Sequence, residues 1–414
     1  MSAAQPHGVE SAYAWWRLAA ALALMTIGAS GMYAMAVALP PVQAEFGVAR
    51  GEASLPYTLT MIGFGIGSIV MGRLADRFGV MVTVLVGAGG LGAGYIAAGN
   101  AGSLWQFSLA LGLLIGFLGT ASTLAPLVAD ISRWFSRRRG IAVAIVMSGN
   151  YLAGTVWPPL MQHFFETVGW RSTFIGTGVF CMLAMPLLAL VLRRPPPEHA
   201  AAAPSVGDSI EDTTRPLGLA PGALLTLLCV AGVACCVAMS MPQVHMVAYC
   251  GDLGFAPARG AEMLSLMLGF GILSRLVSGW ISDHIGGLRT LLLGAALQAV
   301  ALALFLPFQD LAGLYVISAL FGLFQGGLVP SYALIVREYF NLREAGLRTG
   351  IVLTATLFGM ALGGWMPGAI FDATGSYRAA FINGIAWSMV TVAIALFLLR
   401  RTHRGTRTLR PAGA

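Results

Sequence analysis

The sequence predicts an all-α membrane protein with twelve transmembrane helices in two six-helix bundles. Its 414 residues are 57% hydrophobic and only 10% charged, with a mean hydropathy of +0.79. Soluble domains carry about 25% charged residues. The chain also divides into apolar runs of membrane-spanning length, and the pattern Gly-x-x-x-Asp-x-x-Gly occurs twice, about half the chain apart. These observations indicate a duplicated helical bundle.

Apolar stretches of about 20 residues define the spans in chain order. They cover residues 17–40, 53–74, 80–99, 104–129, 139–163 and 171–193, then 218–244, 258–282, 288–308, 311–336, 347–371 and 377–400. The predicted domains are therefore an N-terminal six-helix bundle (1–193) and a C-terminal one (218–400). The Pro/Ala/acid-rich segment 194–217 reads as a cytoplasmic linker that buries no core. Residues 401–414 form a basic cytoplasmic tail.

The arginines set the predicted orientation, because cytoplasmic loops are enriched in basic residues. All 24 basic residues are arginine, and most lie in loops that are cytoplasmic if the N-terminus is inside. The opposite loops hold only Arg50, Arg171, Arg259 and Arg378. We therefore expect both termini to be cytoplasmic and the protein to lie in the inner membrane. The net charge of +7 reports this topology, so no nucleic-acid partner is expected.

The sequence contains none of the motifs that would indicate an enzyme. The glycine-rich run Gly87–Gly94 lies inside a span, where small residues pack helices and do not hold nucleotide. The five cysteines lack metal-ligand spacing. We expect no catalytic residues, no cofactor and no metal.

The segment Leu268–Gly286 places one arginine, Arg275, inside an apolar run. An arginine at bilayer depth costs roughly 2.5–3.5 kcal/mol even on insertion scales, so it is expected to face a polar cavity or a partner. Its planar guanidinium suits a carboxylate, with two charge-assisted hydrogen bonds. The alternative is that Arg275 caps backbone carbonyls near a helix end.

The repeated pattern resembles the loop motif of the major facilitator superfamily. Its first copy is Gly72-Arg-Leu-Ala-Asp76-Arg77-Phe-Gly79, and the second spans Gly279–Gly286. In that family such charges latch the two halves on the cytoplasmic side. The resemblance therefore implies a cytoplasmic gate formed by Asp76, Arg77, Arg133 and Asp283.

Three further stretches resemble the monocarboxylate porter family and its bacterial oxalate/formate-exchanger-like relatives. They are Trp134–Gly149, His245–Phe255 and Phe358–Phe381. Arg275 falls where that family keeps an eighth-helix arginine that grips the substrate carboxylate. Two departures matter: the chain has no lysine for the first-helix or eleventh-helix positions that relatives use, and Gly271 stands where animal carriers place an aspartate. A two-cation dicarboxylate site is therefore disfavoured.

Other polar residues in the predicted spans are candidates for lining the substrate path, although hydrogen bonding between helices explains each one equally well. The candidates are Tyr33, Thr120, Asn150, Tyr151, Gln325 and Tyr332. His245, near the outer end of the seventh span, is the candidate for proton coupling because imidazole titrates near neutral pH. Asp252 and Glu262 in the adjoining loop are expected to be solvated.

The preferred interpretation is a secondary transporter of small monocarboxylates, working by proton symport or anion exchange. Its partners would be a small carboxylate, a proton or counter-anion, and the lipid bilayer, with the protein a monomer. One alternative is an efflux exporter of other small molecules, which should carry a buried acid in its first six helices. Asp130 is the deepest acid there and lies at a helix end. A second alternative is a non-transporting receptor or scaffold, which would tolerate replacement of Arg275.

Overall fold

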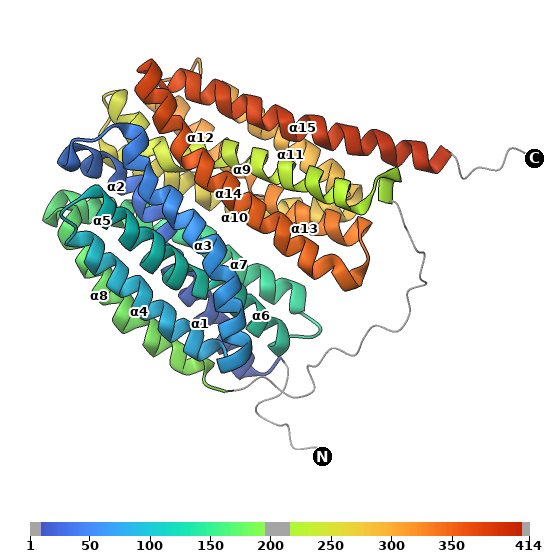
Figure 1. Ribbon diagram of the computed structural model, residues 1–414, viewed down its shortest axis with the longest axis horizontal. Coiled ribbons are helices and arrows are strands. Elements are labelled where there is room, and N and C mark those ends of the chain that lie inside the picture. The colour runs from blue at the N-terminus through green and yellow to red at the C-terminus, as the bar shows by residue number, and fades with distance from the viewer. Residues whose placement is uncertain (1–9, 195–215, 408–414) are drawn as a thin grey trace, which may run out of the picture. The chain divides into compact units, whose positions relative to one another are not determined.

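The computed structural model describes residues 10–194 and 216–407. This described part is helical throughout, without strands, and twelve of its helical segments are long and apolar enough to cross a membrane (Figure 1). The predicted fold class is therefore confirmed. Most of the predicted linker, and the end of the predicted tail, fall at residues 195–215 and 408–414, outside the described residues.

The first six spans are built from eight α-helices, because two of the spans are interrupted. In chain order these helices are α1 (Ala12–Gly28), α2 (Ser30–Phe46), α3 (Arg50–Phe78), α4 (Val80–Gly99), α5 (Leu104–Leu109), α6 (Leu124–Trp134), α7 (Arg139–Val168) and α8 (Trp170–Ala189). Ala29 separates α1 from α2 within one span. A π-helical segment (Ala110–Gly119) and a 3-10 turn (Thr120–Ser122) separate α5 from α6. A second 3-10 turn, Leu190–Leu192, follows α8.

The last six spans follow a short 3-10 turn at Pro216–Gly218. They are α9 (Pro221–Asp252), α10 (Pro257–Ile285), α11 (Gly287–Leu304), α12 (Leu311–Gln325) continued by α13 (Leu328–Tyr339), α14 (Leu342–Thr374) and α15 (Tyr377–Arg407). Within this half, α9 packs against α14 and α15, and α10 packs against α12 (Figure 1).

Contacts between Cα atoms divide the chain into two compact units. Among the described residues, the first unit holds 10–48 and 53–194, and the second holds 49–52 and 216–407. The short segment Ala49–Glu52, which contains the start of α3, thus belongs to the second unit.

The repeated motif has a backbone explanation in its final glycine. Gly79 and Gly286 each precede a helix, with φ/ψ of 86°/162° and 83°/162°. This region of backbone space is essentially restricted to glycine. The two copies of the motif therefore form the same sharp turn between helices.

Glycines spaced four residues apart let neighbouring helices touch backbone to backbone. In the second unit, a Cβ atom at Gly359 or Gly363 of α14 would lie 2.5 Å from the Val233 carbonyl oxygen or 2.4 Å from that of Val237, both in α9. In the first unit, Gly63 and Gly67 of α3 approach the carbonyl oxygens of Gly112 and Phe117 at 2.1 Å and 2.2 Å by the same measure. Such contacts favour membrane helix association, because apolar side chains gain little by leaving lipid.

Gly363→Leu is expected to destabilise the second unit, because the new side chain would force α14 away from α9. Overpacking of a well-packed core costs about 1–3 kcal/mol. The measurement is the thermal unfolding midpoint of the purified protein in detergent. Gly350→Leu, on the same helix, is the matched control, since nothing lies within 4 Å of a Cβ there. Equal midpoints for the two variants would contradict close packing of α9 on α14.

Candidate functional site

Arg275 lies on α10 where the backbones of α10 and of the end of α12 cross. A Cβ on Gly326, which follows α12, would lie 2.7 Å from the Ser274 Cβ, and one on Gly327 would lie 2.0 Å from the Ser278 Oγ. Ser274 and Ser278 are the residues one before and three after Arg275, so the crossing fixes the turn of α10 that carries it. Arg275 itself is half-buried.

Gln325 lies at the same crossing, at the C-terminal end of α12. It is fully buried, and its Oε1 accepts a hydrogen bond from the Nε2 of Gln243 in α9 at 3.1 Å. The Gln325 Nε2 is buried and has no hydrogen-bond partner among the described residues. An amide donor without a partner therefore lies beside the helix turn of Arg275. Tyr332 lies further along in α13 and is also fully buried.

A second group of candidate residues gathers around α2 in the first unit. The Tyr33 hydroxyl donates to the Oδ1 of Asn150 in α7 at 2.8 Å, and the Asn150 Nδ2 lies 3.4 Å from the Met32 Sδ. Thr120 is 2% exposed, and a Cβ on Gly31 would lie 2.9 Å from its hydroxyl oxygen. The structure thus brings Tyr33, Asn150 and Thr120 to one helix. Tyr151 is buried in α7.

Both groups coincide with interruptions in their spans. Thr120 begins the 3-10 turn that breaks the fourth span, and Gln325 ends α12 where Gly326 and Gly327 break the tenth. These spans occupy the same position in each half of the chain. Interrupted helices at corresponding positions of two repeats are typical of transporter binding sites. The hydropathy pattern did not reveal these breaks, although Gly326-Gly327 was a visible local signal.

His245 is 1% exposed in α9 and contacts two other helices of the second unit. Its Nε2 lies 2.8 Å from the Gly364 carbonyl oxygen in α14, and its Nδ1 lies 2.8 Å from the Tyr377 hydroxyl at the start of α15. The ring is therefore held by hydrogen bonds on both nitrogens.

A cluster of charges that the sequence did not indicate lies beside His245. Arg50 forms an ion pair with Asp252, and its guanidinium lies 3.9 Å from the ring centroid of Phe371. The Asp372 carboxylate accepts from the backbone N–H groups of Arg50 at 2.9 Å and Gly51 at 2.7 Å. The sequence analysis expected Asp252 to be solvated and counted Arg50 only as a loop arginine, because no local pattern pairs residues so far apart in the chain.

The four predicted gate residues, Asp76, Arg77, Arg133 and Asp283, are all exposed. Asp76 and Arg133 line a cavity of about 310 Å³ in the first unit, together with Arg17, Arg193 and Arg194. In the second unit, the carboxylate at the helix junction belongs to Glu338. It accepts from the Gly287 N–H at the start of α11 at 2.9 Å. Sequence reasoning missed Glu338 because it lies outside the motif.

A buried ion pair in the first unit joins Arg17 and Asp130, which are 1% and 6% exposed. The contact is bidentate, with Nε to Oδ2 at 2.7 Å and Nη2 to Oδ1 at 2.8 Å. The Arg17 Nη1 also donates to the Arg194 carbonyl oxygen at 3.0 Å, and the guanidinium lies 4.8 Å from the ring centroid of Trp134. The sequence placed Asp130 at a helix end and Arg17 among the arginines of the cytoplasmic side. Asp130 is therefore a buried acid within the first six spans, and the charge of Arg17 neutralises it.

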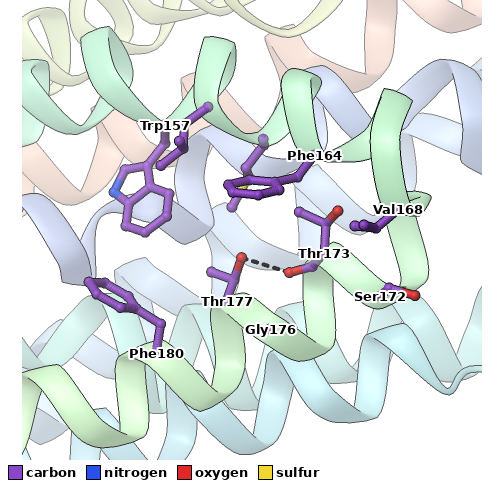
Figure 2. Close-up of a pocket in the computed structure, with 10 residues that line it drawn as sticks. Trp157, Phe164, Val168, Ser172, Thr173, Gly176, Thr177 and Phe180 are labelled. Carbon is purple, nitrogen blue, oxygen red and sulfur yellow. Dashed lines mark hydrogen bonds between the residues drawn. The ribbon is translucent and has the colours of Figure 1, made fainter.

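A further cavity of about 440 Å³ lies between α7 and α8, and Figure 2 shows its lining. Trp157, Phe164, Val168 and Phe180 surround it. Its threonine hydroxyls are already bonded to backbone, as with Thr177 to the Thr173 carbonyl oxygen at 2.8 Å. The residues that line it carry no charge, so it offers nothing to hold an anion.

Comparison with known proteins extends across the whole described chain. The sequence profile of the Major Facilitator Superfamily matches residues 19–311 and 226–414. The chain is 31% identical to monocarboxylate transporter 13 of Bos taurus over 334 residues, which cover 80% of this chain and 76% of that protein. It is 27% identical to human monocarboxylate transporter 11, covering 91% and 81%.

The fold is also similar to that of a bacterial homologue of the human lysosomal transporter Spinster, solved in an inward-facing, occupied conformation. The TM-score is 0.68 at 15% identity, with both chains fully covered. At this identity the likeness concerns the fold alone. These relatives and the solved structure are transporters and not enzymes.

Proposed function

The chain belongs to the major facilitator superfamily and is a membrane transporter, and from this premise we propose that it moves small monocarboxylates by alternating access. Arg275 is the residue proposed to bind the carboxylate. The observation that carries this proposal is a half-buried arginine on a membrane-spanning helix, at the crossing of α10 and α12. Beside it, the Gln325 Nε2 has no hydrogen-bond partner among the described residues. A guanidinium and an amide N–H together suit a carboxylate.

Transport requires only modest affinity. A millimolar dissociation constant corresponds to about 4 kcal/mol, which one bidentate contact and some apolar packing supply. Tyr33, Thr120, Asn150, Tyr151 and Tyr332 are proposed as additional polar lining.

The alternative of an efflux exporter for other small molecules is less well supported. It predicts a buried acid in the first six helices, and Asp130 is buried there, but its charge is already paired with that of Arg17. The second alternative, a non-transporting receptor or scaffold, is not favoured, because the relatives of this chain are transporters.

We further propose an inner-membrane monomer with both termini cytoplasmic, following the arginine distribution. The proposed divisions are the bundles 1–193 and 218–400, the linker 194–217 and the tail 401–414. In this orientation the end of α9 near Asp252 faces outward.

Coupling is proposed to be either proton symport, with His245 as the proton site, or exchange of one anion for another. An empty carrier holds the half-buried cation of Arg275, and moving a charge through the membrane field costs up to about 2.3 kcal/mol per 100 mV. Anion exchange avoids that transition. Net symport needs a titrating group, and the His245 imidazole, hydrogen-bonded on both ring nitrogens, is the one proposed.

The test of the proposed function compares carboxylates with neutral molecules of the same shape. Small 2-hydroxy and 2-oxo monocarboxylates, and the matching amides, are added to the purified protein and thermal unfolding is followed. Millimolar carboxylates should raise the unfolding temperature, and the amides should not. Stabilisation by amides alone, or by neither set, would count against a carboxylate carrier.

Asp76→Asn is expected to slow transport while leaving substrate binding intact, because Asp76 lies at the proposed gate and is exposed. We expect a loss of about ten-fold in uptake rate, as for a contact that biases one conformation by about 1.4 kcal/mol. Carboxylate-induced thermal stabilisation should remain. Loss of that stabilisation in a well-folded variant would place Asp76 in the binding site instead.

A further inference from the structure

The hydrogen bonds of His245 determine which ring nitrogen can receive a proton. The Gly364 carbonyl oxygen only accepts, so the Nε2 that lies 2.8 Å from it carries a hydrogen. In the neutral ring, Nδ1 is then unprotonated and accepts from the Tyr377 hydroxyl at 2.8 Å. Any proton that charges this imidazole must therefore arrive from the side of Tyr377.

Tyr377 connects His245 to a cavity at the same end of the second unit. That cavity, of about 170 Å³, is lined by Tyr377 and by polar groups from Asp252, Gln309, Ser376 and Arg378. At about 30 Å³ per molecule, its volume is on the order of five waters, and its polar lining suits them. His245 does not line the cavity, so the tyrosine lies between the histidine and this space.

Charged and aromatic groups surround this path. Asp252 lines the cavity and has a side chain that is 33% exposed, so it is open to solvent while paired with Arg50. The Arg50 guanidinium lies 5.4 Å from the ring centroid of Tyr377, and Asp372 caps the backbone of Arg50. Tyr249 packs edge-on against Tyr377, with centroids 5.5 Å apart.

We propose that Tyr377 is the proton relay between the outer cavity and His245, an inference that rests on the proposed carboxylate transport. The Tyr377 O–H bond breaks as its proton forms the Nδ1–H bond of His245. The tyrosine oxygen takes a replacement proton from a hydronium ion in the cavity, which becomes water. One proton thus moves from cavity to imidazole, and Tyr377 begins and ends neutral.

A purely structural role for the same hydrogen bond makes a different prediction. If Tyr377 only fixes α15 against α9, its loss would lower stability and all transport modes together. A relay predicts instead a selective loss of proton-driven uptake. Tyr377→Phe separates the two, because phenylalanine keeps the ring contacts with Tyr249 and Phe371 and removes only the hydroxyl.

The experiment uses the full chain in proteoliposomes with two assays, exchange of a labelled monocarboxylate without a pH gradient and uptake driven by an inward proton gradient. The readout is the ratio of the second rate to the first. For Tyr377→Phe and His245→Gln this ratio should fall at least about ten-fold, in line with the 10²–10⁴ typical of a positioned proton-transfer group. Tyr249→Phe is the matched control, since it removes a hydroxyl from the same cavity wall, and its ratio should not change.

Each other outcome has a definite meaning. An unchanged ratio in Tyr377→Phe, equal loss of both rates in that variant, or exchange without proton-driven uptake in the wild type would each overturn the relay. Absence of both activities in the wild type would instead refute the proposed carboxylate transport. A slowing of wild-type proton-driven uptake in D2O, without slowing of exchange, is expected as an independent sign of proton transfer.

Discussion

Arg275→Lys is expected to abolish carboxylate uptake nearly as completely as Arg275→Ala. Lysine keeps the positive charge but offers a point-like ammonium in place of the planar fork that bonds both carboxylate oxygens. Hydrogen bonds to charged groups contribute about 1.5–3 kcal/mol each. Loss of one bond of the bidentate pair should therefore reduce uptake by about ten- to a hundred-fold, at about 1.4 kcal/mol per ten-fold. The measurement is initial-rate uptake of labelled monocarboxylate in proteoliposomes.

Arg259→Lys provides the matched control on the same helix. Arg259 is half exposed, and it pairs with Glu262 one turn along α10. Exposed pairs contribute little, about 1 kcal/mol or less, so this variant should transport within about two-fold of wild type. If Arg275→Lys transports as fast as Arg259→Lys, a positive charge alone is sufficient, and the proposal that the Arg275 guanidinium binds both carboxylate oxygens is wrong.

Much of the fold follows from sequence because the bilayer imposes few solutions. Every backbone group in lipid must be hydrogen-bonded within its own segment, so each apolar run becomes a helix. The predicted span 80–99 matches α4, and span 53–74 lies inside α3. The repeated glycine motif likewise predicted equivalent turns, because the φ values of Gly79 and Gly286 require glycine.

Side-chain pairing was much less predictable. The partners in the Arg17–Asp130 and Arg50–Asp252 pairs are separated by 113 and 202 positions in sequence. Hydropathy placed all four in loops or at helix ends, and it cannot distinguish a solvated charge from a buried one. Only three-dimensional packing brings these partners together.

The candidate site was partly predictable for the same reason. Arg275 was identifiable because a charge within an apolar run is costly wherever it points. The Tyr33–Asn150 hydrogen bond and the Gln243–Gln325 pair join separate helices. In the sequence each of these residues is only a polar side chain within an apolar span. The helix crossings that pair them are visible only in the structure.

Asp130→Asn is expected to cause the largest loss of stability of any single change in the first unit. The substitution leaves Arg17 buried, at 1% exposure, without its bidentate partner. Breaking a buried ion pair by removing one partner costs about 3–5 kcal/mol, because the remaining charge is desolvated and uncompensated. For a unit of this size, the unfolding midpoint should fall by on the order of 10 °C. The measurement is thermal unfolding in detergent, monitored by the fraction of monodisperse protein.

Two comparisons establish whether the penalty comes from the orphaned charge. Glu344→Gln breaks the exposed Arg348–Glu344 pair on α14 and should cost less than about 1 kcal/mol. The double variant Arg17→Met/Asp130→Leu removes both charges and keeps similar volume, so it should regain most of the lost stability, since apolar replacement of a buried pair is often neutral or favourable. If the double variant is as unstable as Asp130→Asn, then the carbonyl contacts of Arg17 and its position over the Trp134 ring stabilise the unit, and the ion pair does not.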